Sequence, residues 1–139
     1  ALAHLNIEAD GHVEFDNCAV GFDLLTPAYN ASDTNVSFLT SNKSGLIFGS
    51  GDITDLNLTF PNGFGNFVLR IQQDGTGGRT ITNWKTFDQA SGNESTVAWP
   101  GGSAPTLSTG ANAVDIISFY WDNTNHKAFG VASLNFSSP

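Results

Sequence analysis

Basic residues are scarce in this sequence. Lys and Arg together number 5 against 13 Asp and Glu, so the 139-residue chain has a formal net charge of −8 and a pI of about 4.4. Proteins that bind nucleic acid or anionic membranes do so with clustered Lys and Arg, and here the five basic residues are scattered along the chain. The charge therefore argues against nucleic acid and against a membrane surface as partners.

Cysteine and long apolar runs are also nearly missing. Cys18 is the single cysteine, so no disulfide can form within the chain. It lies in an apolar run with Ala19 and Val20, which is typical of a buried, unreactive thiol. The first residues, ALAHLNIEADGH, contain neither a basic region nor a long apolar stretch. We therefore expect neither a signal peptide nor a membrane helix.

Helical signals are absent, and the residues that remain favour strands and turns. Charged residues make up only 13%, while Asn, Ser, Thr and Gly are abundant. Thr is favoured in strands, and Asn, Ser and Gly are favoured in turns. Eleven Phe and three Trp are more than a disordered chain carries. The sequence therefore predicts one all-β domain over residues 1–139, with little or no helix.

Alternation of apolar and polar residues predicts the strands. Gly, Asn and Pro clusters separate the alternating runs. About nine strands are expected, which is enough for an antiparallel β-sandwich of jelly-roll type. The expected strands cover residues 4–9, 12–20, 35–39, 45–48, 53–60, 66–73, 79–84, 114–121 and 127–136.

Three connections are expected between these strands. Residues 73–78 (QDGTGG) are predicted as a hairpin turn, because glycine readily adopts positive φ. A phosphate-binding loop would need a helix to follow it, and a calcium loop would need more acidic ligands. Residues 122–125 are predicted as a second hairpin turn. Residues 87–109, rich in Gly, Ser and Pro, are predicted as a long loop that Trp99 anchors by burying its indole.

His12, Glu14 and Asp16 form the sharpest candidate metal site. They alternate along one expected strand, so their side chains would share one face, and imidazole with two carboxylates can bind a divalent ion. The same pattern arises in any half-buried strand, with Val13 and Phe15 facing the core. We therefore expect no metal and no cofactor. The Gly-x-Ser-x-Gly nucleophile motif is missing as well, and we expect no enzymatic activity.

Aromatic residues offer a second kind of site. Trp84, Trp99 and Tyr120 are candidates for a platform on which sugar rings stack. The alternative is that these rings belong to the hydrophobic core, where large aromatic side chains commonly lie.

Three stretches of the second half carry a resemblance to a known group of proteins. They are NFVLRIQQDGTGGRTITNW, VAWPGGSAPTLSTGANAVDIISFYWD and GVASLNF, within residues 66–136. This part resembles a β-rich segment that recurs in tail-fibre and other virion proteins of tailed bacteriophages. The chain differs from the usual pattern by an added stretch at residues 86–96 and by Asp122-Asn123 where Asp-Gly is common. The resemblance implies a structural protein of the virion, assembled in the host cytoplasm.

Two places in the virion fit the resemblance. A tail fibre would need a shaft, such as a heptad coiled coil, and none is visible in these residues. We therefore expect a capsid decoration (cement) protein, with a tail-fibre or receptor-binding tip that recognises host carbohydrate as the alternative. The expected partners are the major capsid protein and further copies of the chain in a homotrimer.

The N-terminal segment, residues 1–20, is the expected contact arm. It is apolar on one face, and a chain terminus can add a strand to a neighbouring sheet. The alternative is that the segment completes the sandwich of its own chain. The expected contacts to the capsid or to another subunit are His4, Leu5, Ile7, Val13 and Phe15.

Overall fold

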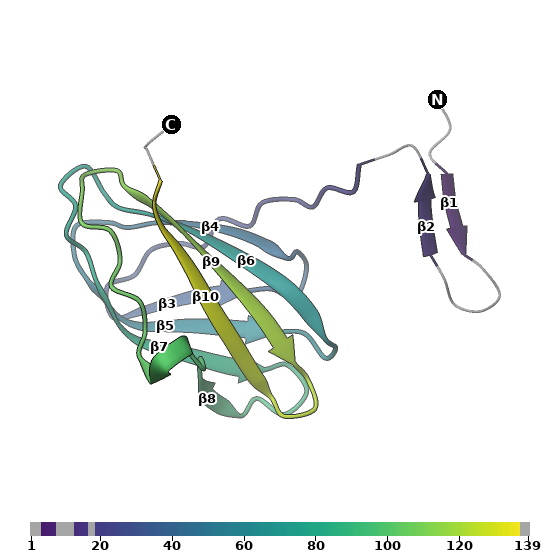
Figure 1. Cartoon of the computed structure of the whole chain (residues 1–139). Helices are drawn as coiled ribbons and strands as arrows, with labels where there is room; N and C mark the ends of the chain where they lie inside the picture. The colour runs from purple at the N-terminus through teal and green to yellow at the C-terminus, as the bar shows by residue number, and fades with distance from the viewer. Residues whose placement is uncertain (1–3, 8–12, 17–18, 137–139) are drawn as a thin grey trace.

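The computed structural model describes residues 4–7, 13–16 and 19–136, and only the backbone of the first two ranges. Two four-stranded sheets pack face to face, and a two-stranded hairpin stands apart from them (Figure 1). The expected all-β sandwich is confirmed. The strands are β1 (His4–Ile7), β2 (Val13–Asp16), β3 (Asp33–Ser37), β4 (Lys43–Ile47), β5 (Ile53–Phe60), β6 (Gly65–Gln72), β7 (Ile81–Asp88), β8 (Glu94–Thr96), β9 (Val114–Asp122) and β10 (Lys127–Phe136).

The chain alternates between the two sheets from β3 to β7. One sheet has the order β3-β5-β7-β8, and the other has the order β10-β9-β6-β4. Strands that are two apart in the sequence, such as β3 and β5, therefore lie side by side in one sheet and run in the same direction. The pairs β3–β5, β5–β7 and β4–β6 are parallel. The expectation of wholly antiparallel sheets is wrong for these three pairs, because consecutive strands cross between layers.

The second half of the sandwich is antiparallel. β7 pairs with β8, and β6, β9 and β10 pair in turn. Residues 123–126 join β9 to β10, so the hairpin expected at residues 122–125 is confirmed with its turn shifted by one residue. Residues 73–78 do not form a hairpin, because β6 and β7 belong to different sheets. They form a connection between the layers instead.

This connection is held by its own side chains. Asp74 accepts hydrogen bonds from the backbone N–H groups of Thr76 and Gly77 and forms an ion pair with Arg79 at 2.8 Å. Gly77 has φ 79°, and a Cβ there would lie 2.4 Å from the carbonyl oxygen of Thr109. Glycine is required at this position because both the dihedral angle and the space exclude a side chain.

Aromatic rings fill the space between the sheets. Phe60 of β5 stacks on Trp121 of β9, with ring centroids 4.7 Å apart and an interplanar angle of 7°. Phe38 and Phe67 pack beside them. The Trp121 indole N–H donates to the carbonyl oxygen of Pro61 at 3.1 Å, so its one polar group is satisfied. These rings join β5 of one sheet to β6 and β9 of the other.

The stretch expected as a long loop is partly ordered into elements. It contains the short strand β8 and a 3-10 turn, η1 (Pro100–Gly102). Trp99 lies just before this turn and packs edge-on against Trp84, with ring centroids 5.2 Å apart. Its ring occupies the space beside Gly130, where a Cβ would lie 2.4 Å away. Trp99 packs against the core as expected, but its indole is only partly buried.

Candidate functional site

The outer face of the sheet β3-β5-β7-β8 is a network of polar side chains. The Asn57 amide donates to Asp33 and, at 3.1 Å, to Asn35. The Lys85 ammonium lies 2.9 Å from Asp55 and 3.6 Å from Glu94. The hydrogen bond from Lys85 is the main reason why the pKa of Asp55 is lowered. Because its groups bond to one another, this face has little need of a partner.

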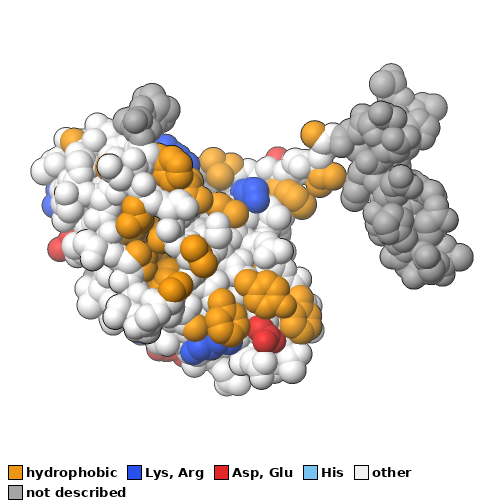
Figure 2. Space-filling model, in the orientation of Figure 1, with side chains coloured by type: hydrophobic (Ala, Val, Ile, Leu, Met, Phe, Trp, Pro, Cys, Tyr) orange, Lys and Arg blue, Asp and Glu red, His pale blue; other side chains and the backbone are white. Residues whose placement is uncertain are grey.

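The outer face of the sheet β10-β9-β6-β4 carries apolar side chains around a central serine, Ser118. We call Val68, Ile116, Tyr120, Phe129 and Val131 the apolar face. Tyr120, Phe129 and Val131 are 48%, 47% and 58% exposed, and the rings of Tyr120 and Phe129 lie 6.5 Å apart. They border a shallow groove of about 380 Å³. Figure 2 shows hydrophobic side chains gathered over the part of this face where β9 and β10 lie.

Charge on this sheet is opposite to that of the whole protein. Its four strands contain two acidic residues, and both are engaged elsewhere. Asp115 is buried and accepts hydrogen bonds from Ser108, while Asp122 is bonded to Asn125 in the β9–β10 turn. Lys43 and Arg70 lie on the outer face of β4 and β6 beside the apolar face. The result is an apolar surface bordered by positive charge on an acidic protein.

The chain enters the sandwich at the edge of this same sheet. Leu25 forms an isolated bridge with Ser44, with its N–H 3.0 Å from the Lys43 carbonyl oxygen. Leu24 packs over Gly45, where a Cβ would lie 3.4 Å from the leucine side chain. Val20, Phe22 and Leu24 are each more than half exposed. The segment that precedes the sandwich therefore exposes an apolar residue at every second position.

The predicted contact residues lie in the hairpin formed by β1 and β2. The strands pair antiparallel, with Leu5 opposite Phe15 and Ile7 opposite Val13, and with His4 opposite Asp16. Their side chains are not among those that the structure describes. The hairpin thus brings the five predicted contact residues into two adjacent strands.

Of the candidate metal site, His12 lies outside the described residues, and Glu14 and Asp16 are described by backbone only. Among the side chains that the structure does describe, no group of His, Cys, Asp and Glu could hold a metal ion. The prediction that the protein needs no metal or cofactor stays a prediction.

The three aromatic residues predicted as a sugar platform do not lie together. Trp84 is only 5% exposed and packs in the core, which prevents a sugar from stacking on it. Trp99 packs against Trp84 at the edge of the core. Tyr120 alone lies exposed, on the outer face beside Phe129. Sequence reasoning missed Phe129 and Val131, although their alternation with Ala128 and Gly130 places them on one face of the strand.

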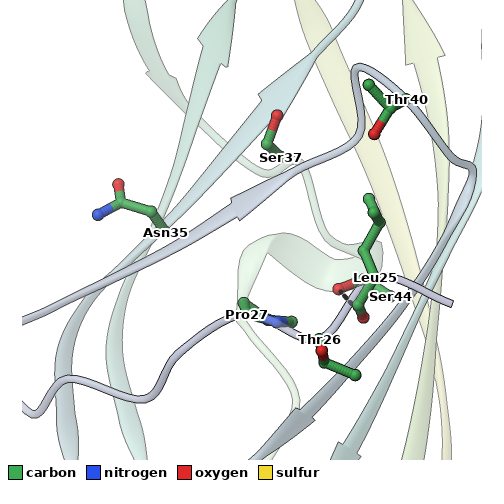
Figure 3. Close-up of a pocket in the computed structure, with 7 residues that line it drawn as sticks. All are labelled: Leu25, Thr26, Pro27, Asn35, Ser37, Thr40 and Ser44. Atoms are coloured by element: carbon green, nitrogen blue, oxygen red, sulfur yellow. Dashed lines mark hydrogen bonds between the residues drawn. The ribbon is translucent and has the colours of Figure 1, made fainter.

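A second hollow lies at the open end of the sandwich, between the chain entry and β3 (Figure 3). Its volume is about 250 Å³. It is lined by Leu25, Thr26, Pro27, Asn35, Ser37, Thr40 and Ser44. These side chains supply hydroxyls and one amide but no ionisable group that could activate a hydroxyl as a nucleophile. The hollow can form hydrogen bonds, and its lining offers no acid–base chemistry.

No known protein family, curated protein or solved structure matches the chain. Within the part of the chain that the structure describes, no helix has the length and apolar character needed to cross a membrane.

Proposed function

We propose that the protein is a structural component of a bacteriophage particle, a decoration protein that binds the assembled capsid as a homotrimer. The resemblance of residues 66–136 to virion proteins of tailed phages supports a structural role in the virion. The proposed role does not require catalysis, because a decoration protein stabilises the closed shell by binding it in preference to free capsid subunits.

The observation that carries this proposal is the difference between the two outer faces of the sandwich. One face bonds amide and charged side chains to one another, among them Asn57, Asp55 and Lys85. The other exposes a tyrosine, a phenylalanine and a valine together, on two neighbouring strands. Exposed apolar groups that lie together mark contact surfaces for other macromolecules. A protein with one such face is suited to an assembly.

Copy number in purified particles tests the decoration role. Quantitative mass spectrometry would compare peptides of this protein with those of the major capsid protein. We expect a ratio near one decoration subunit for each capsid subunit, and a location on the head by electron microscopy. A few copies per particle, located at the tail, would contradict the proposal and favour the alternative below.

Binding to the shell gives a second, independent test. The purified protein should sediment with particles that have been stripped of it and should raise their melting temperature, because a ligand of the closed shell stabilises that state. Separated capsid subunits serve as the control and should not bind. Equal binding to subunits and shell would contradict the mechanism.

A receptor-binding tip is the second candidate function, and one observation favours it. Tyr120 and Phe129 lie half-exposed beside the groove, together with Asn66 and Ser118, which supply polar groups. Aromatic rings next to hydrogen-bonding side chains can bind a sugar. A glycan array tests this candidate: Tyr120→Ala should abolish the signal, whereas Phe64→Ala, at an exposed ring outside the groove, should leave it unchanged.

A further inference from the structure

The hairpin of β1 and β2 is too small to be stable alone. A two-stranded hairpin is at best marginally stable in water unless further strands or another surface cover it. The observed pairings join β1 only to β2, and Figure 1 shows the hairpin standing apart from the sandwich. Its register sets four apolar residues in two directly opposite pairs, Leu5 with Phe15 and Ile7 with Val13. The hairpin therefore needs an apolar surface to pack on.

Charge indicates which surface fits. Residues 1–18 contain four acidic residues and no Lys or Arg. The apolar face is bordered by Lys43 and Arg70, and the acids of its sheet are buried or bonded within a turn. The other outer face carries Asp33, Asp55 and Glu94 against the single Lys85, so its net charge is negative and would repel an acidic segment. Complementary charge and matching apolar character both point to the apolar face.

The linker indicates whose face is covered. Val20 and Phe22 are more than half exposed while the hairpin lies away from its own sandwich. Residues 17–22 can span up to about 20 Å, so the hairpin can be carried beyond the edge of its own sandwich. Docking on a second copy would cover the exposed linker as well as the hairpin.

We propose that residues 1–22 form an arm that docks on the apolar face of a second copy of this chain. The net negative charge of the arm then lies over a surface that Lys43 and Arg70 of that copy border. Each copy gives one arm and receives another, so the contact joins two different surfaces. Such contacts close into rings when the rotation between subunits allows it. The inference rests on the self-association in the proposed function and is independent of capsid binding.

Two variants and their mixture test the arm exchange. One variant lacks residues 1–18. The other carries Tyr120→Ser and Phe129→Ser, two changes at exposed positions. Molar mass is measured by size-exclusion chromatography with light scattering, and folding by circular dichroism. We expect the unaltered chain to form oligomers, each variant alone to be a folded monomer, and the mixture to form a one-to-one dimer. Phe64→Ser is the matched control and should keep the oligomer.

The outcomes separate this inference from the proposed function. If the unaltered chain is an oligomer and both variants remain so, the arm exchange is wrong while the homotrimer stands. If the unaltered chain is itself monomeric, both the exchange and the trimer are wrong, and capsid binding is judged by sedimentation alone. If removal of residues 1–18 unfolds the sandwich, the arm belongs to its own chain and the inference is wrong.

Charge reversal gives a test that leaves the arm and the apolar residues in place. Lys43→Glu with Arg70→Glu should weaken association by about tenfold, as expected for the loss of two surface ion pairs. High salt should weaken the association of the unaltered chain for the same reason. Unchanged association in the charge-reversed variant would contradict the proposed contact between the arm and these two basic residues.

Discussion

The two outer faces of the sandwich differ although their inner faces are alike. On the inner side, both sheets contribute large apolar residues to one core, such as Phe60 from one sheet and Trp121 from the other. On the outer side, the sheet β3-β5-β7-β8 presents amides and paired charges, while the sheet β10-β9-β6-β4 presents Tyr120, Phe129 and Val131. The core accounts for the fold, and the difference between the outer faces is the basis of the proposed contact surface.

The same difference separates two uses of polar residues. The Asn57 amide N–H groups and the Lys85 ammonium bond to neighbours across strands, within the sheet itself. On the other sheet, neither acidic residue pairs with Lys43. Asp115 accepts a hydrogen bond from Ser108, and Asp122 accepts one from Asn125.

Trp121→Ala should destabilise both sheets together. The change removes a fully buried ring that stacks on Phe60, and large aromatic-to-alanine changes in a core cost about 3–5 kcal/mol. Urea unfolding followed by circular dichroism measures the free energy of unfolding. Phe64→Ala, at an exposed ring, is the control and should change it by less than about 0.5 kcal/mol. Separate transitions for the two sheets would contradict a shared core.

Gly130→Val should displace the Trp99 ring, because a Cβ at this position would lie 2.4 Å from it. Overpacking of this kind costs about 1–3 kcal/mol. The tryptophan fluorescence should shift to the red as the indole becomes exposed. Gly63→Ala has no atom within 4 Å of the new Cβ and serves as the control. Unchanged fluorescence in Gly130→Val would show that Trp99 is not held by this contact.

Acid should weaken the fold through carboxylates that are bonded in the folded state. Side-chain hydrogen bonds from Lys85, Arg79 and Ser91 lower the pKa values of Asp55, Asp74 and Asp88, respectively. A carboxylate whose pKa is lowered in the folded state stabilises the protein when the pH is above the pKa of the unfolded chain, which is near 4. This contribution is lost as the pH falls through the lowered pKa of the folded state.

The melting temperature should therefore fall between about pH 4 and pH 2. Asp55→Asn should reduce this dependence, since it removes one titrating group from the polar face while the amide keeps a similar shape. The same slope in the variant and the unaltered protein would show that the Asp55–Lys85 pair makes no contribution.

Single surface changes on the two faces should differ slightly. Lys85→Met removes an ion pair with Asp55 and should lower the melting temperature by a small amount that shrinks in high salt. Phe129→Ser, on the apolar face, should leave the melting temperature of the monomer nearly unchanged. Equal, salt-independent effects at both positions would mean that the two faces do not differ in the way described.

Sequence reasoning predicted the strands well and their partners poorly. The alternation at residues 53–60 and 127–136 coincides with β5 and β10 as observed. Alternation reports which residues share a face, and it carries no information about which strand lies alongside. The parallel pair β5–β7 joins residues 28 positions apart, such as Ile53 and Ile81. The connection at residues 73–78 has the residues of a hairpin turn, yet it crosses between the layers.

The aromatic site was predicted less well because, in one strand, polar residues face the core and an apolar residue faces outward. In β7 the inner face carries Trp84 together with the polar residues Thr86 and Asp88, while Phe87 lies on the outer side. Thr86 and Asp88 would be assigned to solvent from their type alone. Asp88 is buried beside His126 and bonded to Ser91, so tertiary contacts account for its position. Such contacts are invisible in a local pattern.

The winding of the chain between the layers has a consequence for how the protein folds. No two consecutive strands from β3 to β7 pair with each other, so the first half of the sandwich contains no local hairpin that could form early. Its pairings must close loops of more than twenty residues, as between Asp33 and Asp55. Non-local pairing slows folding because loop-closure entropy precedes the gain from contacts. On a ribosome, the sandwich would then wait until the residues of β9 and β10 have emerged before it folds.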